Sequence, residues 1–160
     1  MVNKLKENRI GYDWSKLESE LEYRIPKSFK DFYEKYGPIG IDDYIYIVGA
    51  EETDSSYSLK EHVEYTKYAY NYLLSTQLDD YVGIDFYDGG KGWLPVGYTT
   101  NGDTIFCNNK EVMVADEGFD DKEVYKGSIE NFIDNFIRGN IEDRLLCKVW
   151  EDSEGVQYYR

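Results

Sequence analysis

The spacing of apolar residues changes twice along this chain of 160 residues, and no other feature restricts its fold as much. Apolar residues recur at helical spacing before residue 75, lie in short β-rich runs through the middle, and return to helical spacing at residues 128–138. Turn residues separate the runs, and short connections of this kind join antiparallel neighbours. The sequence therefore predicts an α+β fold: a single domain in which an antiparallel β-sheet carries helices packed mainly on one face.

Four segments have the apolar spacing of amphipathic helices. They span residues 13–22, 26–36, 59–74 and 128–138. Ser15 with Glu18, and Ser58 with Glu61, match the S-x-x-E pattern, so we expect a capping box at the start of the first and third helices. Pro26 suits the first turn of the second helix, where its missing N–H costs nothing. The wide aromatic stripe of that helix fits burial against a sheet.

The β-rich runs are short and contain many β-branched and aromatic residues. We expect strands at residues 44–48, 81–87, 93–98, 104–107 and 112–116. For residues 140–160 two alternatives stay open, an extra strand or a loose tail. No linker or repeat divides the chain, so we expect one domain over residues 1–160.

Acidic residues outnumber basic ones by 32 to 18, which gives a formal net charge of −14. Such a surface repels the phosphates of nucleic acid and attracts cations, so we expect a basic protein partner and no nucleic acid. No run approaches the roughly 18 apolar residues of a membrane span, and the first residues have no signal-peptide pattern. We therefore expect no membrane contact and a cytoplasmic location, while the oligomeric state stays open.

Acids and tyrosines interleave in three segments of a chain with 17 tyrosines. Tyrosine is enriched at interfaces, which makes these segments candidate partner-binding surfaces. The first contains Asp42, Tyr44, Tyr46, Glu51, Glu52 and Asp54, the second contains Asp79, Asp80, Tyr81, Asp85, Tyr87 and Asp88, and the third spans residues 116–125. The alternative is that tyrosines such as Tyr44 and Tyr46 are half-buried strand residues and that the acids only keep the protein soluble.

No set of residues indicates a catalytic centre, a cofactor or a metal ion. His62 is the only histidine, and Cys107 lies in an apolar run with no basic neighbour to lower its pKa. The spacing of Cys107 and Cys147 gives neither a disulfide framework nor a zinc site. Adjacent acids such as Asp120 and Asp121 could bind Mg²⁺ or Ca²⁺, but no segment has the EF-hand spacing. A metal-dependent hydrolase therefore remains an alternative without a supporting ligand pattern.

Several motifs, in this order, resemble the SUKH superfamily of Smi/Knr-like proteins. Trp14 lies in the first helix, Ile25-Pro26 precedes the aromatic helix, and that helix ends at Tyr36-Gly37. Residues 93–97 (WLPVG) and 101–107 (NGDTIFC) resemble the apolar strand and the Gly-Asp hairpin of the family. Family positions matched by this chain are expected to be structural; they are Trp14, Pro26, Tyr36, Gly37, Trp93, Pro95, Gly97, Gly102 and Asp103.

The resemblance implies a protein without catalytic residues that acts by binding another protein. Many bacterial members are immunity proteins that block a toxin domain, often a nuclease, of polymorphic or contact-dependent toxin systems. Fungal relatives act in cell-wall regulation through protein interactions. The resemblance therefore predicts an immunity protein, and a regulatory or scaffolding module of the same fold is the alternative. The chain departs from the family pattern in its long helix at residues 59–74 and in the segment after residue 140.

Overall fold

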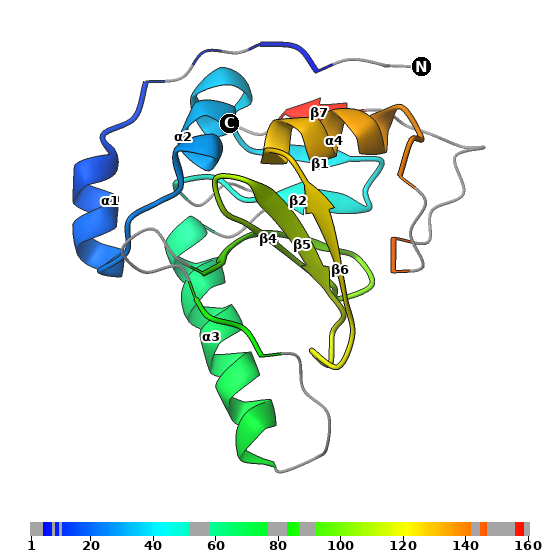
Figure 1. Cartoon of the computed structure of the whole chain (residues 1–160). Helices are drawn as coiled ribbons and strands as arrows, with labels where there is room; N and C mark the ends of the chain where they lie inside the picture. The colour runs from blue at the N-terminus through cyan, green and yellow to red at the C-terminus, as the bar shows by residue number, and fades with distance from the viewer. Residues whose placement is uncertain are drawn as a thin grey trace.

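The computed structural model describes residues 5–7, 9, 11–51, 58–76, 83–86, 92–141 and 145–146, and the backbone alone of residues 156–158. Its elements are α1 (Trp14–Leu21), α2 (Lys27–Tyr36), β1 (Ile39–Ile41), β2 (Ile45–Ile47), α3 (Leu59–Ser75), β3 (Leu94–Thr99), β4 (Thr104–Cys107), β5 (Glu111–Ala115), β6 (Lys122–Lys126), α4 (Ile129–Ile137) and β7 (Val156–Tyr158). The strands form one sheet against which the helices pack (Figure 1), which confirms the predicted α+β class.

The sheet has the strand order β6-β5-β4-β3-β2-β1-β7, and each neighbouring pair is antiparallel. Strands that follow one another in the chain lie side by side, except that β7 pairs with β1. The register of β3 against β4 shifts between Pro95 and Gly97. A Cβ at Gly97 would lie 2.4 Å from the backbone oxygen of Tyr46, so glycine is what lets β3 approach β2 this closely.

Helices cover the two faces of the sheet unequally. On one face α1, α2 and α4 pack around Ile105 and Val114, which lie opposite each other in β4 and β5. On the other face α3 packs its Tyr70 against a smaller cluster that includes Phe106 and Met113. Figure 1 shows α2 and α4 on one side of the strands and α3 on the other. The helices thus lie mainly on one face, as predicted, and α3 is the exception.

Capping boxes begin two of the helices. At α3 the Ser58 hydroxyl accepts the Glu61 N–H, and the Glu61 carboxylate accepts the Ser58 N–H at 3.0 Å, which confirms the predicted box. At α4 the pair Ser128 and Asn131 makes the same two contacts, because the asparagine amide oxygen replaces the glutamate carboxylate.

The start of α1 differs from the prediction. Its cap is Asp13, whose carboxylate accepts the Ser15 N–H at 3.1 Å, so the predicted box of Ser15 and Glu18 is wrong. Glu18 instead accepts the Ile25 N–H at 2.9 Å and pairs with Lys30 at 2.6 Å. The Glu18 carboxylate therefore makes tertiary contacts with the segment between α1 and α2 and with α2, instead of capping α1 as the local pattern predicts.

The predicted strands at residues 44–48, 93–98, 104–107 and 112–116 correspond to β2, β3, β4 and β5. In the predicted run 81–87, residues 83–86 make only an isolated bridge between Phe86 and Trp93, so no strand is present there, and residues 81, 82 and 87 lie outside the described residues. Two strands are not predicted by the sequence pattern: β1, which has three residues including a glycine, and β6. As an edge strand, β6 alternates exposed and half-buried residues and has no apolar run to reveal it.

Among the described residues, no helix combines the length and the apolar character that crossing a membrane requires.

Candidate protein-binding surface

The structure places the residues of the first predicted cluster in different surroundings. Tyr44 is buried, and its ring stacks on Phe136 of α4 with centroids 6.2 Å apart. Tyr46 is half-buried and stacks on Tyr98, at 5.2 Å, on the face that α3 covers. Asp42 lies in the turn between β1 and β2 with a left-handed φ of 53°. Tyr44 is therefore part of the core, and its ring is not available to a partner.

Much of the second predicted cluster falls outside the described residues. These residues are Asp79, Asp80, Tyr81, Tyr87 and Asp88, and Glu52 and Asp54 of the first cluster also lie outside the described residues. Asp85 is exposed, and its backbone oxygen accepts the Trp93 N–H at 2.7 Å. That hydrogen bond ties the segment before β3 to the start of the strand.

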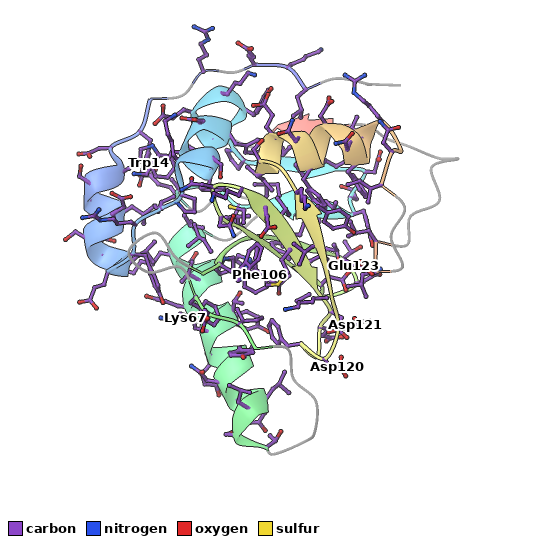
Figure 2. All side chains as sticks on the ribbon, in the orientation of Figure 1. Trp14, Lys67, Phe106, Asp120, Asp121 and Glu123 are labelled. Atoms are coloured by element: carbon purple, nitrogen blue, oxygen red, sulfur yellow. The ribbon has the colours of Figure 1, made fainter. Side chains whose placement is uncertain are left out.

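The third predicted cluster, residues 116–125, comprises the turn between β5 and β6 and most of β6, and Figure 2 labels Asp120 and Asp121 in the turn. One carboxylate oxygen of Asp116 accepts the N–H groups of both residues, at 3.0 and 3.1 Å. Burial raises the pKa of Asp116, and the nearby Asp120 carboxylate raises it further. Tyr125, at the other end of the segment, packs its ring on Phe132 of α4 at 5.1 Å. The segment therefore offers an acidic turn, residues 116–121, whereas Tyr125 points toward the core. We call residues 116–121 the acidic turn.

Glu51 belongs to a cleft between α1 and the first turns of α3, with a volume of about 550 Å³. Its charged lining is Asp13, Lys16, Glu20, Glu51, Lys60, Glu61 and Glu64. Both lysines pair with Glu20, at 4.0 Å for Lys16 and 3.5 Å for Lys60. Five carboxylates against two ammonium groups make this cleft negative, which favours a cationic group over an anionic one.

Among the residues that the structure describes, the most exposed aromatic side chains lie on α3, outside the three predicted clusters. Tyr65, Tyr68 and Tyr72 are 69%, 69% and 59% exposed, and we call these three residues the tyrosine ridge. The apolar spacing of α3 predicts its buried face, whereas these three tyrosines lie on the opposite face. The i, i+3, i+7 spacing of the three tyrosines was the signal that would have revealed the ridge.

A groove of about 300 Å³ separates α3 from the hairpin of β3 and β4 and from the acidic turn. Tyr65 and Ala69 line it from α3, and Glu117 and Phe119 line it from the turn. Gly102, at the tip of the hairpin, has a φ of +93°, and a Cβ there would lie 3.1 Å from the Glu117 side chain. The family-motif hairpin thus forms one wall of the groove and holds Glu117 close to it.

His62 and Cys107, the two candidate catalytic side chains that the structure describes, are both enclosed. Burial lowers the pKa of His62 to about 4, so the ring is neutral near pH 7, and its Nε2 lies 3.0 Å from the backbone oxygen of Gly97. Since that oxygen can only accept, Nε2 carries the proton and fastens α3 to β3. Burial raises the pKa of the Cys107 thiol far above its ordinary value. Within the described part of the chain, no group of three or more His, Cys, Asp or Glu residues is arranged to hold a metal ion.

Trp14 and Tyr36 connect the helices. The Trp14 indole N–H donates to Glu34 at 2.6 Å, and the Tyr36 hydroxyl donates to Glu130 of α4 at the same distance. Figure 2 shows Trp14 between α1 and α2. Both contacts hold helices to one another rather than face solvent.

The remaining motif residues shape turns and strand ends. The Pro26 carbonyl accepts the Phe29 N–H at 3.0 Å, and Gly37 ends α2 with a φ of 74°. Asp103 is buried and accepts the Thr99 hydroxyl at 2.6 Å, while burial raises its pKa. In the sheet, Pro95 lies opposite Phe106 of β4. These contacts all lie within the fold of the chain.

The model of the SMI1/KNR4 family (SUKH-1) matches residues 12–135 of the chain, from the residue before Asp13 to within α4. The chain belongs to this family. Searches of curated proteins and of solved structures found no match. In this SUKH-1 family member the matched range includes α3, with the tyrosine ridge, and the acidic turn.

Proposed function

We propose that this SUKH-1 family member is an immunity protein that binds the toxin domain of a polymorphic or contact-dependent toxin system and blocks it. The observation that carries the proposal is the family match over residues 12–135. Many bacterial members, as the resemblance implies, act in this way. The proposed complex forms in the cytoplasm of the cell that makes the toxin or of its kin, and it makes or breaks no covalent bond.

The charge of the chain supports a basic toxin, such as a nuclease. A nuclease needs a positively charged groove to hold the phosphates of its substrate. A protein with a net charge of −14 and exposed carboxylates can cover such a groove by presenting negative charge in place of phosphate. Electrostatic attraction of this kind chiefly raises the association rate.

Growth rescue provides the test. Each toxin domain encoded near the gene for this chain serves as a candidate and is produced under an inducible promoter in a bacterial host. Co-production of this chain is expected to restore growth, and the purified pair is expected to bind more weakly as NaCl rises from about 0.05 M to about 0.5 M. An unrelated toxin domain of similar charge serves as the control, since a cognate immunity protein should not rescue it.

Two outcomes would decide against parts of the proposal. If the chain rescues growth but its affinity for the toxin does not change with salt, the electrostatic part of the proposal is wrong and the immunity function stands. Absence of rescue, together with recovery of a cellular protein unrelated to toxins in a pull-down from the native cell, would favour the regulatory or scaffolding alternative.

A further inference from the structure

Exposed apolar side chains concentrate on one helix. Among the described residues five large apolar side chains are exposed, and four of them, Tyr65, Tyr68, Tyr72 and Leu74, lie on α3. The rings of Tyr68 and Tyr72 stack with centroids 6.4 Å apart and planes 20° from parallel. Single exposed apolar residues such as Leu74 are ordinary, but a contiguous group such as the tyrosine ridge often marks a contact with another molecule.

The fold of the chain does not account for this group. The residues that anchor α3 to the sheet are on its opposite side; they are Leu59, His62, Val63, Thr66 and Tyr70, and all are buried. Removal of the ridge rings would leave these contacts intact. The ridge therefore contributes little to folding, and its exposed area has to be explained by binding.

The charges beside the ridge are negative because the lysines of α3 are held elsewhere. Lys60 pairs with Glu20 of α1 at 3.5 Å. Lys67 donates to the Tyr23 hydroxyl, and its ammonium lies 4.5 Å from the Tyr23 ring centre. Figure 2 shows Lys67 on the side of α3 that faces α1. Glu61 and Glu64 are exposed and lie four residues before Tyr65 and Tyr68, which places them on the ridge side of the helix.

The groove beside the ridge also combines aromatic and acidic side chains. Tyr65 belongs to both, since it is exposed and lines the groove. Glu117 is exposed on the opposite wall, and none of the ion pairs among the described residues includes it. A long cationic side chain in the groove would have its stem against Ala69 and Phe119 and its charge between an aromatic ring and a carboxylate. That surrounding suits arginine or lysine, through cation–π and ionic contacts.

We propose that the tyrosine ridge and the adjoining groove dock an arginine- or lysine-bearing surface of the basic partner, with one cationic side chain held between Tyr65 and Glu117. This inference rests on the proposed function and assigns the surface that performs it. Nucleic acid is disfavoured because Glu61, Glu64 and Glu117 repel phosphate. A second copy of the chain is disfavoured because both copies carry a net charge of −14.

The test measures the affinity of the toxin domain for ridge and groove variants by calorimetry. Tyr68→Ala and the double variant Tyr65→Ala/Tyr68→Ala should weaken binding by at least about 10-fold, as expected when a central aromatic contact is lost. Tyr65→Phe keeps the ring and should retain most of the affinity. Glu117→Gln should weaken binding and reduce its salt dependence. Asp31→Asn, an equal charge change at an exposed position of α2, is the matched control and should leave the affinity unchanged.

The outcomes separate the failure of this inference from the failure of the proposed function. Toxin binding that is equally tight in every ridge variant would overturn the docking surface and leave immunity standing. If the wild-type chain does not bind the toxin domain, a synthetic arginine-alanine repeat peptide is added to isotope-labelled protein, with a citrulline-alanine peptide as the neutral control.

In that second experiment, chemical-shift changes at Tyr65, Tyr68 and Glu117 with the arginine peptide alone would support the surface for another basic partner. No change at these residues would overturn it. Light scattering after size exclusion adds one further outcome: a wild-type dimer that the ridge variants convert to monomers would assign the ridge to self-association and would also overturn the proposal.

Discussion

The helices α2 and α3 are both rich in aromatic residues, and they use them in opposite ways. In α2, Phe29, Phe32, Tyr33 and Tyr36 are at most 7% exposed. In α3 only Tyr70 is buried to that extent, while Tyr65 and Tyr68 are 69% exposed. Packing explains every aromatic side chain of α2, but it explains only one of the four tyrosines of α3. The comparison shows that aromatic content by itself does not distinguish a core from a binding surface, and that the direction of the side chain does.

The largest effect is expected at the buried side of α2. Phe29 is fully buried and contacts the Trp14 ring at a centroid distance of 6.2 Å. Phe29→Ala should lower the free energy of unfolding by about 3–5 kcal/mol, because it removes apolar contacts and leaves a cavity. Urea denaturation measures the change. A loss below about 1 kcal/mol would contradict the packing described for this face.

The next effect is a pH dependence at the buried side of α3. The folded pKa of His62, about 4, lies below the ordinary value of 6.5, so the unfolded chain binds more protons between these two values. Stability contributed by the neutral ring is therefore complete above pH 6.5 and decreases as the pH falls toward 4, by roughly 3 kcal/mol in total.

His62→Gln keeps an N–H donor near the backbone oxygen of Gly97 and cannot titrate in this range. Unfolding free energies of the variant and the wild type, measured at several pH values from 7 to 4, should diverge as the wild type loses stability faster. Parallel curves would show that His62 is not enclosed in the way described.

A smaller effect compares the caps of the helices on the two faces. Ser58→Ala at α3 and Ser128→Ala at α4 each remove a hydroxyl that accepts a backbone N–H, so each should cost about 1 kcal/mol. Thermal unfolding should show similar shifts for the two variants. Only Ser58→Ala should also weaken binding of the toxin domain, because only α3 carries the ridge. A similar loss of binding in both variants would place the partner on both faces of the sheet. No loss in either variant would place the partner on neither helix.

The smallest effect on stability is expected at the ridge. Tyr68→Ala should change the free energy of unfolding by no more than about 0.5 kcal/mol, since the side chain is exposed and alanine favours a helix. Denaturation curves that nearly superimpose on those of the wild type are the expected result. A loss as large as that of Phe29→Ala would show that the tyrosine packs within the fold, and the contrast between α2 and α3 would disappear.

The parts of the fold that the sequence predicts well are those with a strong local pattern. Ser58 and Glu61 mark the start of α3, and the run of residues 104–107 becomes β4 without a change of limits. Where local and long-range demands compete, the prediction fails. Glu18 matches a capping pattern but instead contacts Ile25 and Lys30, which the folded chain brings to it.

The candidate site is only partly predictable for the same reason. Interleaved acids and tyrosines led to Tyr44 and Tyr125, both of which turn toward α4. Interleaving of acids and tyrosines along the sequence is a poor guide to a binding surface, because it does not show which side of a strand or helix each residue occupies. Helical spacing would have found Tyr65, Tyr68 and Tyr72, but it would not have found Glu117. That carboxylate comes close to Tyr65 only because the acidic turn and α3 border the same groove.

The sequence alone determined the α+β class, the extents of the helices, the net negative charge and the family, because each of these follows from composition or from patterns of neighbouring residues. Tertiary structure alone decided that α3 packs Tyr70 on the face of the sheet opposite α2 and α4 (Figure 1), that β6 is an edge strand and that β7 pairs with β1. It also decided which carboxylates lie beside the tyrosine ridge. The reason is that the periodicity of apolar residues and the charge can be read from neighbouring residues in the sequence. Strand order, and which residues lie beside a given surface, are instead set by contacts between residues far apart in the sequence.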